Sequence, residues 1–300
     1  MVEQEKVVKK GISGYVATVG AAAMLLFGGA AYAQQFIYGN SASGTPQNLY
    51  KIDAATGVVV KTCTMNKGNG RGIVVVGTDV FYTVAGSGNI FKTDINTCAD
   101  MGVAFAVPGA TSLSTIAYDG TNFWVGDYAG TNRAFYVSPT GTLLTTITLA
   151  SCGGSCDGLE FFKDGSGNSR LISNRGDAPN TGYDVYSTSG GAPLTAQFIA
   201  PTTFSTTGIA FDGTNFVVSD IFNQKLQFYS GATGAFVKTV TITGMVAGDN
   251  QLEDLSADYA QVLGPPPGPI IVPTLSEWTL IALSLMLAAF GLLAAYRMRR

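Results

Sequence analysis

Short runs of alternating apolar and polar residues fill the chain from about residue 36 to residue 260. Val, Ile, Thr, Phe and Tyr dominate these runs, and Gly, Asp, Asn and Ser separate them. Alternation with a period of two is typical of a β-strand with one buried face, and Asp-Gly pairs between such runs are typical of hairpin turns. The pattern therefore predicts a domain built almost entirely from short, consecutive antiparallel strands.

The strand pattern repeats along the chain. The stretches "TIAYDGTNFWVGDYAG" and "GIAFDGTNFVVSDIFN" share an apolar strand, a D-G-T-N turn and a second strand, and two more divergent copies accompany them. The equivalent apolar positions of the four copies are Ile73, Ile116, Leu159 and Ile209. These positions are 43, 43 and 50 residues apart, and each copy contains four strand-like runs. Four strands in about 40 to 50 residues is the period of a β-propeller blade.

The two ends of the repeat region complement each other. Residues 36–65 match the second, third and fourth strands of a repeat, whereas residues 252–260 match only a first strand, with Leu255 lying 46 residues after Ile209. Joined, they complete a fifth blade. The sequence thus predicts an all-β, five-bladed β-propeller over residues 34–264 that is closed by strands from both termini. A solenoid or an irregular sandwich of the same hairpins is the alternative.

The repeat also has a recognisable rhythm, "I-A-x-D-G-T-N" followed by "D-x-x-T-G". Over residues 36–260 this rhythm resembles NHL-type and streptogramin-lyase-like propellers. The resemblance implies the fold and says little about function, because propellers carry many unrelated activities.

An apolar segment precedes the predicted propeller. Two lysines lead into an Ala- and Gly-rich run that ends in an A-x-A site, formed by Ala31 and Ala33, immediately before Gln34. This order is typical of a secretory signal peptide. We interpret residues 1–33 as a signal peptide removed by signal peptidase, with an uncleaved N-terminal anchor as the alternative.

A second apolar segment, residues 279–296, follows the propeller. Its 18 residues carry no charge, and at about 1.5 Å per residue a helix of this length reaches roughly 27 Å, enough to cross the hydrocarbon of a bilayer. Arg297, Arg299 and Arg300 come next, and the positive-inside tendency places such a cluster in the cytoplasm. We therefore expect one C-terminal transmembrane helix, a basic tail at 297–300 and an exported domain anchored in the inner membrane.

A Pro-rich spacer and a short motif connect the propeller to this helix. Residues 265–271 should form a semi-rigid, extended spacer. The motif that follows consists of Val272, Pro273, Thr274, Leu275, Ser276, Glu277 and Trp278. Together with the helix and the basic tail, it resembles the IPTL-CTERM sorting signal of Gram-negative bacteria over residues 272–300. It departs from that pattern at Val272, where Ile is usual, and at Thr279, where Gly is usual.

The resemblance to IPTL-CTERM proteins implies a route to the cell surface. It implies that an exosortase-type membrane transpeptidase recognises the P-T-L-x-x-W segment, removes the helix and passes the protein to the cell surface or the extracellular space. The alternative is a plain C-terminal anchor in which Trp278 lies at the membrane interface.

Composition narrows the functional classes. Residues 34–270 contain 11 Lys and Arg against 17 Asp and Glu, a formal charge of −6, so we expect no nucleic-acid partner, which would require a basic face. The chain has no histidine, which excludes catalysis by an imidazole and His-ligated zinc or haem. The "DGSGNS" turn at Asp164 places oxygens at alternate positions but lacks the Gly and the Glu of a calcium loop. We expect no metal and no cofactor.

The four cysteines suit an oxidising compartment. An even number in an exported chain predicts disulfides, and three pairings are possible. Because "CGGSC" encloses three small residues, we favour Cys152 with Cys156 and therefore Cys63 with Cys98. Unpaired buried thiols are the alternative.

Two functions remain from different classes. A secreted glycosidase or lyase would need two channel carboxyls about 5 to 10 Å apart, and the weak candidates are Glu160 on the predicted inner strand of blade four, with Glu253, Asp254 and Asp157 near strand starts. Most other acids fall in turns, where Asp caps its own backbone. We prefer a non-catalytic, surface-displayed propeller that acts in the envelope or extracellular matrix by binding a carbohydrate, a protein or another copy of itself.

Overall fold

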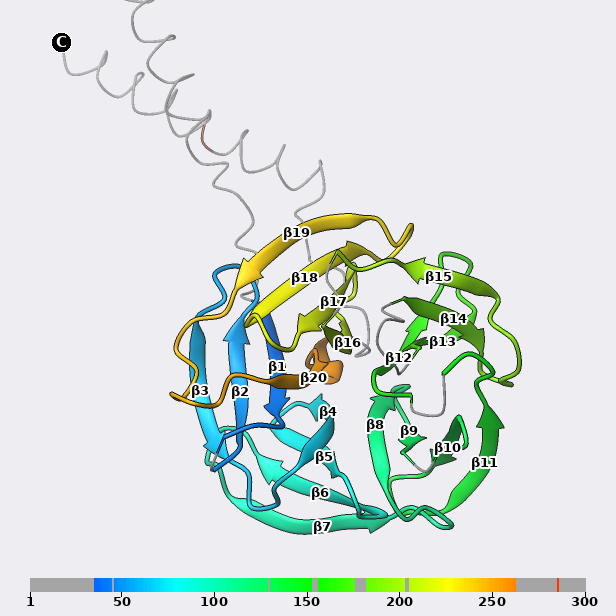
Figure 1. The fold of residues 1–300 in the computed structure, drawn as a ribbon, viewed down its shortest axis with the longest axis horizontal. Helices are drawn as coiled ribbons and strands as arrows, with labels where there is room; N and C mark the ends of the chain where they lie inside the picture. Colours follow the sequence, from blue (N-terminus) through cyan, green and yellow to red (C-terminus); the bar gives the residue numbers. More distant parts are fainter. Residues whose placement is uncertain are drawn as a thin grey trace, which may run out of the picture. The chain divides into compact units, whose positions relative to one another are not determined.

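The computed structural model describes residues 35–262, apart from 45, 129, 153–155, 176–181 and 203–204, together with residue 285. The described residues form five four-stranded antiparallel sheets arranged around an axis (Figure 1). The predicted five-bladed propeller is therefore confirmed. The closure is confirmed as well, because β20, from the C-terminal side, pairs with β1, from the N-terminal side.

In each blade the first strand lies nearest the axis and the fourth lies at the rim (Figure 1). Blade one consists of β20 (Leu252–Ser256), β1 (Phe36–Ser41), β2 (Asn48–Asp53) and β3 (Val59–Thr64). Blade two consists of β4 (Gly70–Val76), β5 (Asp79–Val84), β6 (Asn89–Asp94) and β7 (Asp100–Ala106). Blade three consists of β8 (Leu113–Tyr118), β9 (Phe123–Asp127), β10 (Arg133–Val137) and β11 (Leu143–Thr148).

The last two blades have the same order. Blade four consists of β12 (Leu159–Lys163), β13 (Ser169–Asn174), β14 (Tyr183–Ser187) and β15 (Thr195–Ile199). Blade five consists of β16 (Thr206–Phe211), β17 (Asn215–Asp220), β18 (Lys225–Ser230) and β19 (Phe236–Thr241). A single turn of helix, α2 (Tyr259–Val262), follows β20.

The D-G-T-N turns form as the sequence predicts. Asp119 accepts hydrogen bonds from the backbone N–H groups of Thr121, at 2.9 Å, and Asn122, at 2.8 Å. Asp212 makes the same two bonds in blade five. An Asp side chain that satisfies the turn in this way fixes where one strand ends and the next begins.

The core consists of five apolar layers, each between two neighbouring blades. The layer between blades four and five, for example, contains Phe162, Tyr183, Ile209, Phe216 and Tyr229. Because each blade buries its apolar faces only against its neighbours, the stability of every blade depends on the closure of the ring.

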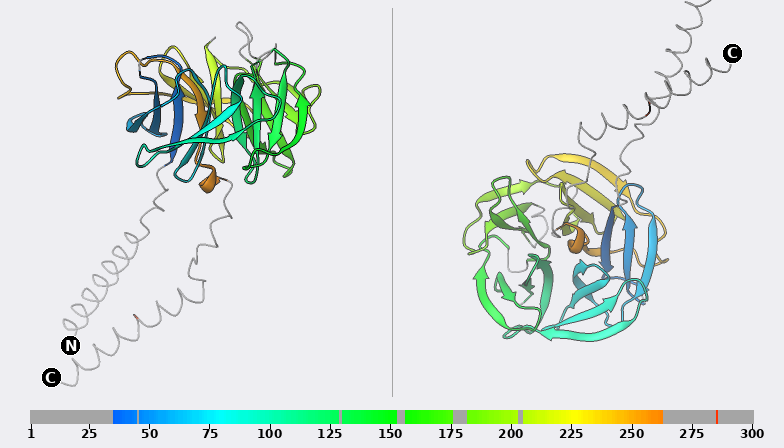
Figure 2. Two further views of the ribbon diagram at one scale, coloured as in Figure 1. Left: turned by 90° about the horizontal axis from the view of Figure 1, so that it is seen from below. Right: turned by 180° about the vertical axis from the view of Figure 1, so that it is seen from behind.

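Both ends of the described propeller lie on one face. Gln35 donates through its side chain to the carbonyl of Asp212 at 2.7 Å, and Asp258 accepts from the N–H of Gly77 at 2.8 Å. Both partners belong to turns between the first and second strands of a blade. We call this the terminal face. Figure 2 shows α2 at this face of the propeller.

The structure contains both predicted disulfides, and the predicted pairing is confirmed. Cys63 lies on the outermost strand of blade one and Cys98 in the β6–β7 turn of blade two, so this disulfide joins neighbouring blades. Cys152 and Cys156 lie in the connection that leads into blade four, and both are buried.

Several predicted segments lie outside the described residues. They are the signal peptide with its cleavage residues Ala31, Ala33 and Gln34, the Pro-rich spacer, the sorting motif and, apart from residue 285, the C-terminal apolar segment. In the part of the chain that the structure describes, no helix is both long and apolar enough to cross a membrane.

Candidate functional site

The innermost strands come very close together at one level of the axis. The residues that occupy equivalent positions there are Gly72, Thr115, Gly158, Gly208 and Asp254. A Cβ on Gly72 would lie 2.7 Å from the Cα of Thr115, and a Cβ on Gly208 would overlap the backbone of Asp254. Three of the five positions are therefore glycine because a side chain would not fit between the strands.

The Asp254 carboxylate occupies the space that these glycines leave. One of its oxygens accepts from the N–H groups of Ile209, at 3.2 Å, and Leu255, at 2.9 Å. The other accepts from the N–H of Ile73 at 3.2 Å and from the hydroxyl of Thr115 at 3.1 Å. A single side chain thus binds strands of blades one, two, three and five.

Thr115 extends this arrangement to the remaining blade. Its hydroxyl oxygen accepts a hydrogen bond from the N–H of Leu159, on the first strand of blade four, at 3.0 Å. Burial raises the pKa of Asp254 well above its ordinary value, although the hydrogen bonds that it accepts lower it. Asp254 is fully buried, so this predicted channel acid connects the blades and is not accessible to a substrate.

Glu160 lies nearer the terminal face. Its carboxylate accepts from the N–H of Phe161 at 2.6 Å, from the N–H of Phe211 at 3.1 Å and from the hydroxyl of Tyr259. Burial, with a smaller effect of the nearby Asp254, raises the pKa of Glu160 well above its ordinary value. The structure thus places Glu160 on the inner strand of blade four, as predicted, where it holds α2 against the end of the channel.

The other two acids lie toward the opposite face. Glu253 is 3% exposed and forms an ion pair with Arg71, whose guanidinium lies 5.2 Å from the ring centroid of Tyr128. Burial raises the pKa of Glu253, and Arg71 opposes that rise. The backbone N–H of Asp157 donates to the side chain of Asn174 at 2.9 Å. The structure therefore places Glu253 and Asp157 near Arg71, keeps Asp254 and Glu160 at other levels of the axis, and does not gather all four predicted acids around one open site.

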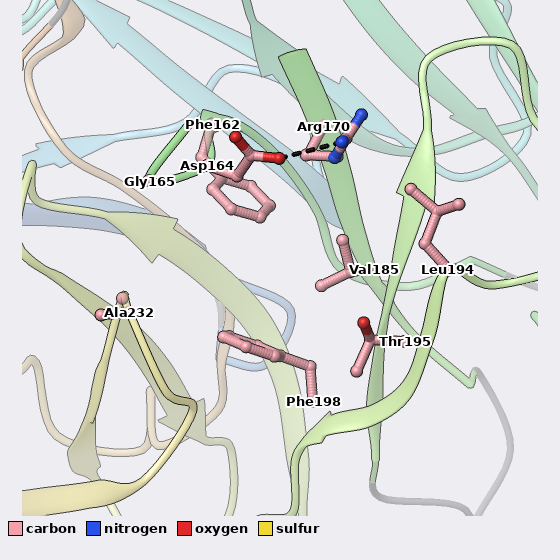
Figure 3. Close-up of a pocket in the computed structure, with 10 residues that line it drawn as sticks. Phe162, Asp164, Gly165, Arg170, Val185, Leu194, Thr195, Phe198 and Ala232 are labelled. Carbon is pink, nitrogen blue, oxygen red and sulfur yellow. Dashed lines mark ion pairs between the residues drawn. The ribbon is translucent and has the colours of Figure 1, made fainter. Parts of the chain in front are cut away.

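An open pocket of about 420 Å³ lies elsewhere, on the terminal face between blades four and five. Blade four contributes Phe162, Val185, Leu194, Thr195 and Phe198, and blade five contributes Gly231 and Ala232 from the β18–β19 turn. Figure 3 shows the ring of Phe162 above that of Phe198, with Val185 and Thr195 to the right of the two rings.

A charged pair forms one rim of this pocket (Figure 3). Arg170 and Asp164 form an ion pair in which Nη2 of the guanidinium lies 2.9 Å from Oδ2 of the carboxylate. Asp164 also accepts from the side chain of Asn168 at 3.1 Å and from the N–H groups of Ser166, at 2.9 Å, and Asn168, at 3.0 Å. The hydrogen bonds from Asn168 contribute most to lowering the pKa of Asp164. The Asp164 carboxylate of the "DGSGNS" turn is thus occupied by the N–H groups of its own turn and by Arg170. This arrangement does not suit a calcium ligand.

Sequence reasoning did not find this pocket. Its walls combine residues from all four strands of one blade with a turn of the next, and a repeat pattern does not show which side chains come together between blades. The described residues contain no group of three or more acidic, Cys or His side chains placed to hold a metal ion.

The remaining observation concerns the C-terminal segment. Residues 272–300 match the IPTL-CTERM motif. The chain carries an IPTL-CTERM motif. This motif implies an exported protein that is sorted to the cell surface. The match confirms the resemblance predicted from Pro273, Thr274 and Leu275.

The fold of the propeller has relatives among solved structures. A chain of the nidogen/laminin complex superposes with a TM-score of 0.50 and 10% sequence identity, covering 75% of this chain and 98% of that one. A hydrazine synthase from Kuenenia stuttgartiensis gives a TM-score of 0.40 and 16% identity, covering 59% of this chain and 50% of that one. The comparison with curated proteins gives no match. At 10% identity the likeness to the chain of the nidogen/laminin complex concerns the fold alone.

Proposed function

We propose that this protein is exported, processed at its IPTL-CTERM motif by an exosortase-type transpeptidase, and displayed at the cell surface as a non-catalytic propeller that binds an extracellular ligand. The motif at residues 272–300 is the observation that carries the proposal. The signal peptide at 1–33, the spacer at 265–271 and the inner-membrane helix at 279–296 are the further parts that this route requires.

The geometry of the channel supports binding over catalysis. A glycosidase needs two carboxyls on either side of a substrate, but Glu160 and Asp254 are buried and accept hydrogen bonds from the protein itself. The only charged residue paired with Glu253 among the described residues is Arg71. These acids are explained by the closure of the propeller, so a channel hydrolase or lyase is the weaker candidate.

The sorting step is tested by substitution in the motif. We expect Pro273→Ala combined with Trp278→Ala to leave full-length protein in the inner membrane, because both residues belong to the segment that the transpeptidase would read. Intact-mass spectrometry of each cell fraction from the native host measures the outcome. Ser276→Ala is the matched control, since it changes a position of the motif that tolerates different residues. Release of the double variant at the wild-type level would overturn the proposal.

A further inference from the structure

The pocket between blades four and five is built for a particular kind of ligand. We infer that it binds the neutral end of a glycan, a monosaccharide or disaccharide unit. This inference rests on the proposed function, because it names the ligand class of a displayed propeller. It is carried by the shape of the pocket, by its charges and by the exposed apolar surface at its rim.

The shape suits a small ring. A volume of about 420 Å³ lies within the range of small-ligand sites, which is roughly 300 to 1,000 Å³. Phe198, which is only partly buried, presents aromatic surface to the hollow (Figure 3), whereas Phe162 belongs to the core and is 4% exposed. A sugar ring has apolar C–H faces and a polar edge, so one face can lie against the ring of Phe198 while its hydroxyls reach the rim.

The charges favour a neutral ligand. The hydrogen bonds of its turn favour the ionised form of Asp164. The Arg170 guanidinium, 2.9 Å from the carboxylate, balances its negative charge. The Arg170 guanidinium forms an ion pair with Asp164, and of its five N–H groups one donates to the carbonyl of Ser169, so others remain for a ligand. A guanidinium beside a carboxylate offers hydrogen-bond donors to hydroxyl oxygens, whereas the carboxylate repels an acidic sugar. The hydroxyl of Thr195 adds a donor and an acceptor.

The rim supplies apolar area for binding. Leu194, which lines the pocket, is 56% exposed. Covering it would remove apolar surface from water, a favourable contribution of roughly 25 cal/mol per Å². An apolar peptide side chain would also gain from this contact but would not use Arg170 and Thr195, so the two ligand classes can be separated by experiment.

The test uses the full-length protein in detergent micelles and isothermal titration calorimetry. The probes are glucose, galactose, mannose, N-acetylglucosamine, cellobiose and laminaribiose, with glucuronic acid and a Phe-containing hexapeptide as competing classes. We expect at least one neutral sugar to bind, and Phe198→Ala and Arg170→Gln each to weaken it by about tenfold or more. Phe236→Ala is the matched control, because Phe236 is an exposed aromatic residue of blade five outside the pocket.

Each outcome decides the matter. Failure of all six neutral sugars to bind, binding that Phe198→Ala leaves unchanged, or binding only of glucuronic acid or the peptide would overturn the inference. If Phe198→Ala fails to fold, Ala232→Trp, which fills the pocket from the β18–β19 turn, replaces it and should abolish binding. Because binding is measured on purified protein, its failure leaves the sorting proposal standing, and failure of sorting leaves the binding result unaffected.

Discussion

At the scale of single residues, Asp254 shows how one side chain can join the inner strands of four of the five blades. Its two oxygens accept four hydrogen bonds, from Leu255 on its own strand and from Ile73, Thr115 and Ile209 on three others. Each of the three backbone donors belongs to a residue that is at most 1% exposed. The contribution of Asp254 to stability therefore depends on the placement of its two acceptor oxygens as well as on its charge.

Asp254→Asn tests this dependence. The amide NH₂ group cannot accept a hydrogen bond, so it leaves at least one buried backbone N–H without a partner: that of Ile73 in one orientation, and those of Ile209 and Leu255 in the other. We expect the free energy of unfolding to fall by about 1–3 kcal/mol, measured by urea denaturation followed by circular dichroism. Asp94→Asn, in an exposed turn where an amide oxygen can still accept the capping bonds, should behave as wild type. An Asp254→Asn variant of undiminished stability would contradict the role given to the carboxylate.

Glu160 makes stability depend on pH. A carboxyl whose pKa is higher in the folded protein than its ordinary value of 4.5 binds more protons when folded. Its contribution to the free energy of unfolding is therefore complete below about pH 4.5 and is lost as the pH rises through the raised pKa. Asp254 acts in the same direction. We expect stability to decrease from about pH 4.5 upward.

The slope of this pH dependence is the measurable quantity. Glu160→Gln removes one of the titrating groups, so its free energy of unfolding, measured in urea at a series of pH values, should change less steeply above pH 4.5 than that of the wild type. Asp94→Asn is again the control, because the pKa of Asp94 is lowered and it titrates below this range. Equal slopes for Glu160→Gln and the wild type would show that burial does not perturb Glu160.

At the scale of elements, the turn between the third and fourth strands recurs in all five blades. At one equivalent position of this turn every residue has a positive φ, and the five residues are Gly57, Cys98, Gly141, Gly190 and Gly234. A Cβ on any of these four glycines would come too close to the outermost strand of the preceding blade. Where the other blades have glycine, blade two has a cysteine at φ 61°, and this cysteine forms a disulfide with the outermost strand of blade one.

This equivalence gives a prediction about the Cys63–Cys98 disulfide. Without the disulfide, alanine at position 98 keeps the strain of a left-handed residue, whereas glycine removes it. We expect Cys63→Ala with Cys98→Gly to be about 1 kcal/mol more stable than Cys63→Ala with Cys98→Ala. Both variants should be less stable than the wild type, by about 3–4 kcal/mol for the alanine pair, since a loop of 35 residues is released.

Urea denaturation of the two double variants under identical conditions provides the measurement. Only position 98 differs between them, so each is the control for the other. A glycine variant no more stable than the alanine variant would mean that the turn changes its conformation once the disulfide is gone.

The elements also show how far sequence reasoning reaches. Strand order, the D-G-T-N turns and the two disulfides could be predicted because they depend on neighbours in sequence or on a repeat that can be aligned. The glycines Gly72, Gly158 and Gly208 can be found in the same alignment, because each immediately precedes an equivalent apolar position. Their role around Asp254 could not be predicted, since it depends on how closely the inner strands approach each other. The pocket could not be predicted, since Phe162 and Ala232 come to line one hollow only through the packing of two blades.

At the scale of the whole molecule, the closing strand decides whether the ring exists. A chain that ends after Gln251 would lack β20, Asp254 and Tyr259, and would expose the layers that flank blade one. We expect it to lose cooperative unfolding and near-UV circular dichroism. A chain that ends after Val262 retains every described contact of the propeller and is the matched control. A native-like spectrum and a single sharp unfolding transition for the shorter chain would show that the other strands suffice.

The position of the closing strand has a mechanical consequence. β20 runs along the axis and continues through α2 toward the spacer, so under the proposed surface display any tension between the C-terminal attachment and a bound ligand enters the propeller through this strand. Pulling along β20 loads its hydrogen bonds with β1 in shear, together with those of Asp254, so that many bonds share the force instead of opening one after another. A ring fastened in this way is well suited to remain folded while the cell and its surroundings pull on it from opposite ends.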